Sequence, residues 1–62
     1  MILTFNYGEK IKYIDDDNIY QLGYFLNYNN RDYCQIMNEA GFIFMTRISY
    51  VKKIMEIPKY LK

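Results

Sequence analysis

The sequence predicts a mainly β protein: a small five-stranded antiparallel barrel or strongly bent sheet, with one short 3₁₀ or helical turn near the C-terminus. Aromatic residues are abundant, with eight Tyr and four Phe among 62 residues, and aromatic side chains favour strands. Tyr and Leu alternate with other residues along positions 20–28, which is the period of a half-buried strand and not of a helix. Short clusters of Asp, Asn and Gly separate the apolar segments, as turns do between strands.

The chain is predicted to be a single domain, residues 1–62, at the small end of domains that fold alone. Cys34 is the single cysteine and there is no His, so neither an intramolecular disulfide nor the usual structural zinc site is expected, and no cofactor is predicted. The fold must therefore be stabilised by the packing of Tyr and Phe rings or by self-association. A homo-oligomer, most simply a homodimer, is expected because residues 19–28 are apolar on both faces.

The N-terminal part of the chain is expected to form a hairpin. Residues 2–7 alternate Leu, Phe and Tyr with Ile, Thr and Asn, which predicts a half-buried strand. Gly8 and Glu9 predict a turn, and residues 10–14 alternate charged and apolar side chains as a second strand. We expect these two strands to pair with each other.

The next element could be a helix or a strand. Residues 15–18 could cap a helix, since Leu22 and Leu26 follow at helical spacing. Gly23 and the neighbouring aromatic residues disfavour a helix, so we predict a strand over residues 20–28. Its buried face is expected to carry Tyr20, Leu22, Tyr24 and Leu26.

The C-terminal half predicts further strands separated by polar turns. Asn29 and Asn30 indicate a turn, residues 31–37 a strand, residues 38–41 a hairpin loop that ends in Gly, and residues 42–46 the next strand.

Residues 47–57 allow two interpretations. Ile48, Val51 and Met55 have the spacing of a short helix, whereas alternation from Val51 onward indicates a strand. We predict one tight helical turn at residues 49–51, followed by a short closing strand that ends at Ile57, before Pro58.

The segment GFIFMTRISYVKKI, residues 41–54, resembles the end of a Src-homology-3-like small β-barrel. In that fold a hairpin strand leads into a single 3₁₀ turn, often ending Ser-x-Tyr-Val, and then into a closing strand. Ser49, Tyr50 and Val51 occupy that place, with the intervening residue missing. Peptide-binding members hold polyproline ligands in an aromatic groove. The resemblance carries over only Tyr50 as a groove aromatic, and related small barrels bind RNA, DNA or other proteins.

No enzymatic activity is expected, and no catalytic residue is predicted. Cys34 lies in an apolar strand and has no His to activate it, so a buried structural thiol is expected. No Gly-rich phosphate loop is present. Asp15, Asp16 and Asp17 lack the alternating spacing of a calcium loop, which favours a solvated loop or an acidic loop that meets a basic partner surface.

Charge is distributed unevenly along the chain. Residues 1–46 carry three cations and six carboxylates, a net charge of −3, and residues 47–62 carry five cations and one carboxylate, a net charge of +4. A basic end could meet nucleic acid, an acidic protein or a membrane surface, or could be a solvated strand or tail.

The prediction for function is a non-enzymatic protein-binding module. The tyrosines are too numerous to share one buried face, and exposed Tyr is enriched at protein interfaces. The abundance of Ile, Lys, Asn and Tyr reflects AT-rich codons and favours a phage or mobile-element protein that inhibits a host protein by occlusion. The candidate partner-binding residues are Tyr28, Tyr33, Arg47, Tyr50, Lys52 and Lys53.

The alternative is a nucleic-acid-binding small barrel that uses the basic C-terminal segment and exposed tyrosines. We rank it second and expect no salt-sensitive binding to DNA or RNA, because the net charge is only +1 and residues 15–17 would repel phosphates. No signal peptide and no membrane span are expected, and the unpaired Cys34 predicts a cytoplasmic location.

Overall fold

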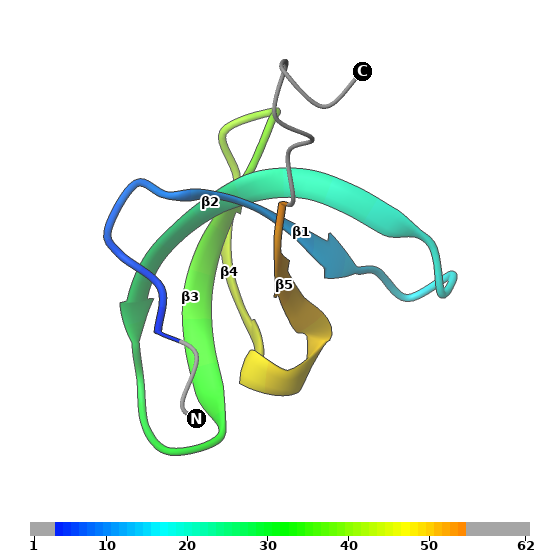
Figure 1. Cartoon of the computed structure of the whole chain (residues 1–62). Helices are drawn as coiled ribbons and strands as arrows, with labels where there is room; N and C mark the ends of the chain where they lie inside the picture. Colours follow the sequence, from blue (N-terminus) through cyan, green and yellow to red (C-terminus); the bar gives the residue numbers. More distant parts are fainter. Residues whose placement is uncertain (1–3, 55–62) are drawn as a thin grey trace, which may run out of the picture.

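The structure is a computed structural model that describes residues 4–54, which form one bent antiparallel sheet and a single 3₁₀ turn (Figure 1). The elements are β1 (Lys10–Ile14), β2 (Tyr20–Tyr28), β3 (Tyr33–Asn38), β4 (Ile43–Arg47), η1 (Ile48–Tyr50) and β5 (Val51–Lys53). The strand order is β4-β3-β2-β1-β5, with every neighbouring pair antiparallel. The predicted mainly β class, with five strands and one 3₁₀ turn, is confirmed. Within residues 4–54 the edge strands β4 and β5 do not pair with each other, so the sheet is not closed.

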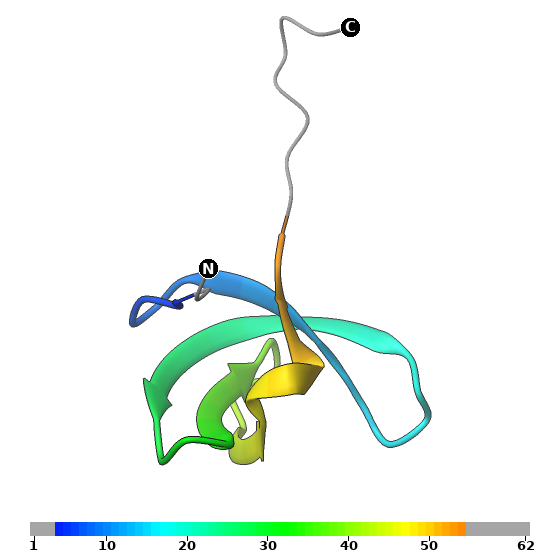
Figure 2. The same cartoon turned by 60° about the horizontal axis from the view of Figure 1, so that its bottom comes forward.

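The bend of the sheet is centred on β2, a long strand that is drawn as an arch in both views (Figures 1 and 2). The first half of β2 pairs with β1 and its second half with β3, so this one strand belongs to both halves of the bent sheet. The pairing register with β3 shifts between Phe25 and Asn27, which makes Leu26 the extra residue of a β-bulge. The bulge reverses the alternation, so Tyr28 returns to the concave side, opposite Cys34.

The core lies on the concave face. One row of side chains crosses the sheet from Phe25 to Ile36 to Phe44, and a second row joins Gly23 to Ile11. The buried residues are Phe5, Ile11, Tyr13, Phe25, Cys34, Ile36 and Val51, with Phe44 and Ile48 packed against them. Cys34 is fully buried, as predicted, and burial raises the pKa of its thiol, which keeps it neutral.

The predicted buried face of β2 is wrong. Phe25 is 1% exposed, whereas Leu22 is 41% exposed and Leu26 is half-buried on the convex side. Both faces of this strand are apolar enough to be buried, so its own pattern cannot choose between them. The partner strands decide, because they set Ile11 opposite Gly23 and Ile36 opposite Phe25.

The predicted N-terminal hairpin is also wrong. Residues 4–6 are not in a strand, and residues 2 and 3 lie outside the described residues. The turn at Gly8 is confirmed, with a positive φ of 82°. This turn directs the chain to β2: the Phe25 N–H donates to the Glu9 carbonyl at 2.9 Å, and the Gly8 N–H donates to the Phe25 carbonyl at 2.7 Å.

The loops agree with their predicted polar character. Asp15 and Asn38 each accept two backbone N–H bonds through one side-chain oxygen, from the residues two and four positions later, and Asn30 accepts two from Asp32 and Tyr33. The turn predicted at residues 49–51 lies one residue earlier, as η1. The closing strand covers Val51–Lys53, and its predicted end at residues 55–58 lies outside the described part of the chain.

The corrected register of β2 predicts a ranking of substitutions. Phe25→Ala should lower the free energy of unfolding by about 3–5 kcal/mol, since it leaves a cavity against the rings of Phe5 and Tyr28. Leu26→Ala should cost no more than about 1 kcal/mol, because this side chain is only half-buried. Urea denaturation of both variants measures the difference, and Phe25→Leu replaces Phe25→Ala if the latter does not fold. Equal losses, or a larger loss for Leu26→Ala, would contradict the register.

Gly23 provides a second test. A Cβ at this position would lie 2.6 Å from the Met37 carbonyl oxygen and 3.1 Å from the Tyr13 Cε1 atom, so the backbone itself must shift. Replacing Gly by Ala inside a strand ordinarily raises the free energy of unfolding by roughly 0.5–1 kcal/mol. Here we expect Gly23→Ala to lower the free energy of unfolding by about 1–3 kcal/mol. The control is Asn27→Ala, at an exposed position on the same strand. A stabilised Gly23→Ala variant in thermal unfolding would show that β2 and β3 approach less closely than described.

Candidate functional site

A groove of about 390 Å³ lies between the loop that follows β1 and the segment formed by β4 and η1. An adjoining hollow of about 330 Å³ shares Tyr13, Asp15 and Asn38 with it and extends toward Glu39 in the β3–β4 loop. We call the two together the acidic groove. The first part is lined by Tyr13, Ile14, Asp15, Asp16, Asn38, Phe44, Met45, Thr46 and Tyr50.

Aromatic rings contribute to the wall of this groove. Tyr13 and Phe44 meet edge to face, with ring centroids 5.4 Å apart and an angle of 67° between the rings. Tyr50 projects from η1 and is 43% exposed, so its ring is available to a ligand. Burial, with the nearby carboxylates of Asp15 and Glu39, raises the pKa of Tyr13, which therefore keeps its hydroxyl proton.

Acidic residues also line the groove. The Asp15 Oδ1 atom accepts the Asp17 N–H at 2.9 Å and the Ile19 N–H at 3.0 Å, and its Oδ2 atom accepts the Gln21 Nε2–H at 2.8 Å. The Ile19 N–H bond, then the Gln21 bond, lower the pKa of Asp15, so it remains charged at neutral pH. Asp16 is exposed beside it.

The chemistry of the groove is thus negative charge next to aromatic faces. Among residues 4–54 no three His, Cys, Asp or Glu side chains are placed to hold a metal ion. A carboxylate beside an exposed ring suits an organic cation such as a Lys or Arg side chain, through an ion pair and a cation–π contact.

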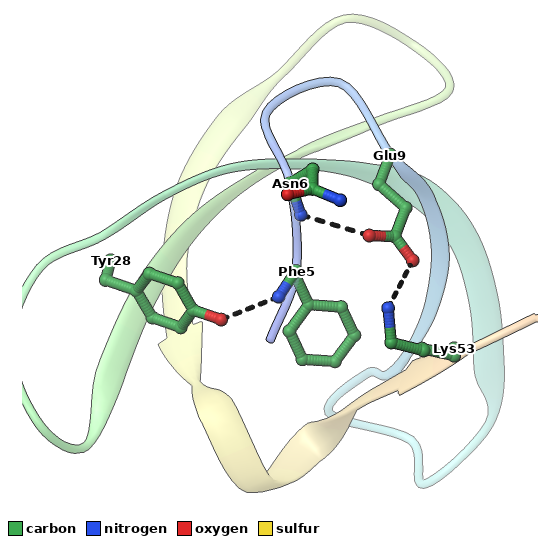
Figure 3. Close-up of polar contacts among 5 residues, drawn as sticks. All are labelled: Phe5, Asn6, Glu9, Tyr28 and Lys53. Carbon is green, nitrogen blue, oxygen red and sulfur yellow. Dashed lines mark hydrogen bonds and ion pairs between the residues drawn. The ribbon is translucent and has the colours of Figure 1, made fainter. Parts of the chain in front are cut away.

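Of the six candidate partner-binding residues, only Tyr50 lines this groove. Tyr28 and Lys53 instead hold the N-terminal segment (Figure 3). The Tyr28 hydroxyl oxygen accepts the Phe5 N–H at 2.7 Å. The Lys53 Nζ atom lies 3.0 Å from the Glu9 Oε2 atom and 5.2 Å from the Phe5 ring centroid. These contacts keep Phe5 in the core, and a role in partner binding for Tyr28 and Lys53 stays a prediction.

The other three candidates lie on the convex face of the sheet. Arg47 stands over the Tyr33 ring at 5.2 Å from its centroid, near one edge of the sheet. Lys52 lies at the opposite edge, directly across from Lys12. The six residues therefore do not form one cluster.

Residues that the sequence reasoning missed complete the groove. Phe44 and Tyr13 belong to strands that were predicted, and Asp16 to a loop that was predicted, but nothing in the linear pattern brings them together. The signal in the sequence that points to the groove is the acidic loop itself, which predicts a contact with a basic partner surface.

The outer edge of β4 is apolar and has no strand paired to it within the described residues. Its exposed large side chains are Ile43 and Met45, preceded by Phe42. An apolar free edge is suited to pairing with another strand, so this feature agrees with self-association, which stays a prediction.

No family model, no curated protein and no solved structure matches the chain. In the described part of the chain no helix is long and apolar enough to cross a membrane.

The Glu9–Lys53 contact predicts an acid-sensitive stability. The Asn6 N–H bond to Glu9, then the Lys53 side chain, lower the pKa of Glu9 in the folded state. A lowered folded pKa means that the stabilisation is fully present above the unfolded pKa, about 4.3, and is lost as the pH falls through the folded value. Glu9→Gln keeps an acceptor oxygen but cannot titrate, so its unfolding free energy should fall less steeply below about pH 4.

Thermal unfolding between neutral and acidic pH measures this difference. Asp15→Asn removes the second carboxylate whose pKa is lowered, so the stability of this variant should also fall less steeply with decreasing pH. Asp17→Asn, in the same loop, is the matched control. If both Glu9→Gln and Asp15→Asn lost stability at acidic pH as steeply as the wild type, these carboxylates would be ruled out as the cause of the acid sensitivity.

Proposed function

We propose that the protein is a non-enzymatic binding module that holds a cation-bearing segment of a protein partner in the acidic groove. The single observation that carries this proposal is that Asp15, Asp16 and the half-exposed Tyr50 line the same groove. A Lys or Arg side chain of the partner would reach both the carboxylates and the ring.

The size of the groove supports a short linear segment as the ligand. A volume of about 390 Å³ is at the low end of ligand pockets, roughly 300–1,000 Å³, and accommodates one or two side chains. The exposed apolar residues Phe42, Ile43 and Met45 continue from the β4 side of the groove and could contact neighbouring apolar residues of the partner. A polyanion is a poor occupant of this groove, because Asp15, Asp16 and Glu39 would repel phosphates.

We also propose that the fold is a Src-homology-3-like small barrel. The support is the order of its last elements, since β4 leads through η1 directly into β5 at the place of Ser49, Tyr50 and Val51. Peptide-binding members of that fold hold polyproline ligands in an aromatic groove. Here carboxylates accompany Tyr50, which favours a cationic ligand over polyproline.

Binding of this kind would act by occlusion, with the partner's cationic segment covered while it is held. The AT-rich coding pattern supports a phage or mobile-element protein whose partner is a host protein. This part of the proposal rests on composition and not on geometry.

A random-peptide display library, selected on the immobilised full chain, tests the proposal. The recovered peptides should carry Lys or Arg next to apolar residues. Tyr50→Ala and Asp16→Asn should each weaken their binding by about tenfold, the loss of one aromatic anchor or one charge-assisted contact. Asp32→Asn, which removes an exposed carboxylate from the β2–β3 loop, is the matched control and should have no effect.

The position of the bound peptide is a second readout. Amide chemical shifts should change at Tyr13, Asp16 and Tyr50. Selection of peptides without cations, an equal effect of Asp32→Asn, or shift changes confined to the convex face would reject the groove as the binding site.

A further inference from the structure

The structure separates positive from negative charge. The five strands carry five cations and no carboxylate: Lys10, Lys12, Arg47, Lys52 and Lys53. All carboxylates of residues 4–54 lie in the loops, and three of them line the acidic groove. Lys53 is paired with Glu9, which leaves the convex face of β1 and β5 with unopposed positive charge.

Two of these lysines face each other directly. Lys12 and Lys52 are Cα partners across the β1–β5 pair, and Lys10 lies two residues along β1 on the same face. Like charges directly opposite each other are destabilising. None of the three makes an ion pair with any group in residues 4–54. An anion bound above them would relieve this repulsion.

A row of apolar and aromatic side chains runs beside the lysines. Tyr20, Leu22 and Tyr24 of β2 lie on the same face, with Leu22 opposite Lys12 and Tyr24 opposite Lys10. Neighbouring strands are about 4.8 Å apart, so cations and rings form two parallel rows. The two rows meet where the Lys12 Nζ atom stands 4.8 Å from the Tyr20 ring centroid.

We propose that this basic face, formed by Lys10, Lys12, Lys52, Tyr20, Leu22 and Tyr24, binds single-stranded nucleic acid. The lysine row would contact phosphates, and the exposed Tyr20 ring with the half-buried Tyr24 ring would contact unstacked bases. A positively charged track beside aromatic platforms is the combination that holds single strands without sequence preference. A duplex should bind more weakly to this face, because its bases are already stacked and paired with each other.

The basic face lies mainly on the opposite side of the sheet from the acidic groove, and the two adjoin at Leu22, which also lines the hollow beside Glu39. The concave-face residues Tyr13, Phe44 and Thr46 line the groove, whereas the lysines and tyrosines of the basic face are on the convex side and line neither part of it. The near-zero net charge of the chain disfavours nucleic-acid binding when the sequence is considered alone. In the structure, however, the lysines of the basic face and the acidic residues of the groove lie mainly on different faces of the sheet. A phosphate chain that followed Lys10, Lys12 and Lys52 would therefore contact three cations on the convex side.

Fluorescence anisotropy of the full chain with a short oligothymidylate tests this proposal. Three phosphate contacts predict a slope of log affinity against log salt of about −2, at roughly −0.7 per contact for single strands. Lys12→Gln and Lys52→Gln should each reduce the slope by about 0.7, and Tyr20→Ala should weaken binding about tenfold with the slope unchanged. Arg31→Gln, which removes the same charge from the β2–β3 loop, should leave both quantities unchanged.

Further probes separate this proposal from the alternatives. Tyr50→Ala, in the acidic groove, should bind the oligonucleotide as the wild type does, so failure of the peptide experiment leaves this result intact. Polyglutamate should bind more weakly than oligothymidylate, since it offers charge without bases. Equal binding of polyglutamate, an unaltered affinity of Tyr20→Ala, or no salt-dependent binding at all would overturn the proposal. Thermal unfolding of each variant confirms that it is folded under the conditions of the measurement.

Discussion

Phe25 is the residue on which the rest of the structure depends. Its ring stacks on Phe5 at 5.3 Å between centroids and contacts the Tyr28 ring at 4.8 Å. Its backbone N–H and C=O also bond to Glu9 and Gly8, so one residue joins β2 to the N-terminal segment by both packing and hydrogen bonding. With no disulfide available, these contacts are the means by which so short a chain covers the open side of its core.

The bulge at Leu26 makes this arrangement possible. Without the extra residue, strict alternation would turn Asn27 to the concave side and Tyr28 away from it. With it, the Tyr28 ring reaches Phe25 and its hydroxyl oxygen accepts the Phe5 N–H. A local irregularity in one strand therefore determines how the N-terminal segment docks. It also explains why Tyr28, expected as a partner contact, takes part in structural contacts.

The two proposed binding surfaces lie mainly on opposite faces of the sheet because successive side chains of a strand point to opposite faces. The concave side of β1 places Tyr13 beside the groove, while the convex side presents Lys10 and Lys12. Every carboxylate of residues 4–54 is in a loop and three of them line the groove, whereas five of the six cations lie on strands. The net charge of +1 is therefore the sum over a positively charged surface and a negatively charged one.

Local chemistry in the sequence determined the turns and the type of each element. Asp15, Asn30 and Asn38 organise the loops where polar clusters were predicted, and the positive φ of 92° at Gly41 ends the hairpin loop as expected. The strands over residues 20–28, 31–37 and 42–46 and the single turn near Tyr50 needed only alternation and turn residues, and each was placed within about two residues.

Tertiary structure decided what local pattern leaves undetermined. Both faces of β2 are apolar, so only pairing with Ile11 and Ile36 could select Phe25 for the core and leave Leu22 exposed. The N-terminal segment alternates like a strand, but pairing of Gly8 and Glu9 with Phe25 replaces the predicted hairpin. The groove joins Asp16, Phe44 and Tyr50 from three separate elements. Such contacts arise from the pairing and bending of distant strands, and the order of residues along the chain carries no direct record of them.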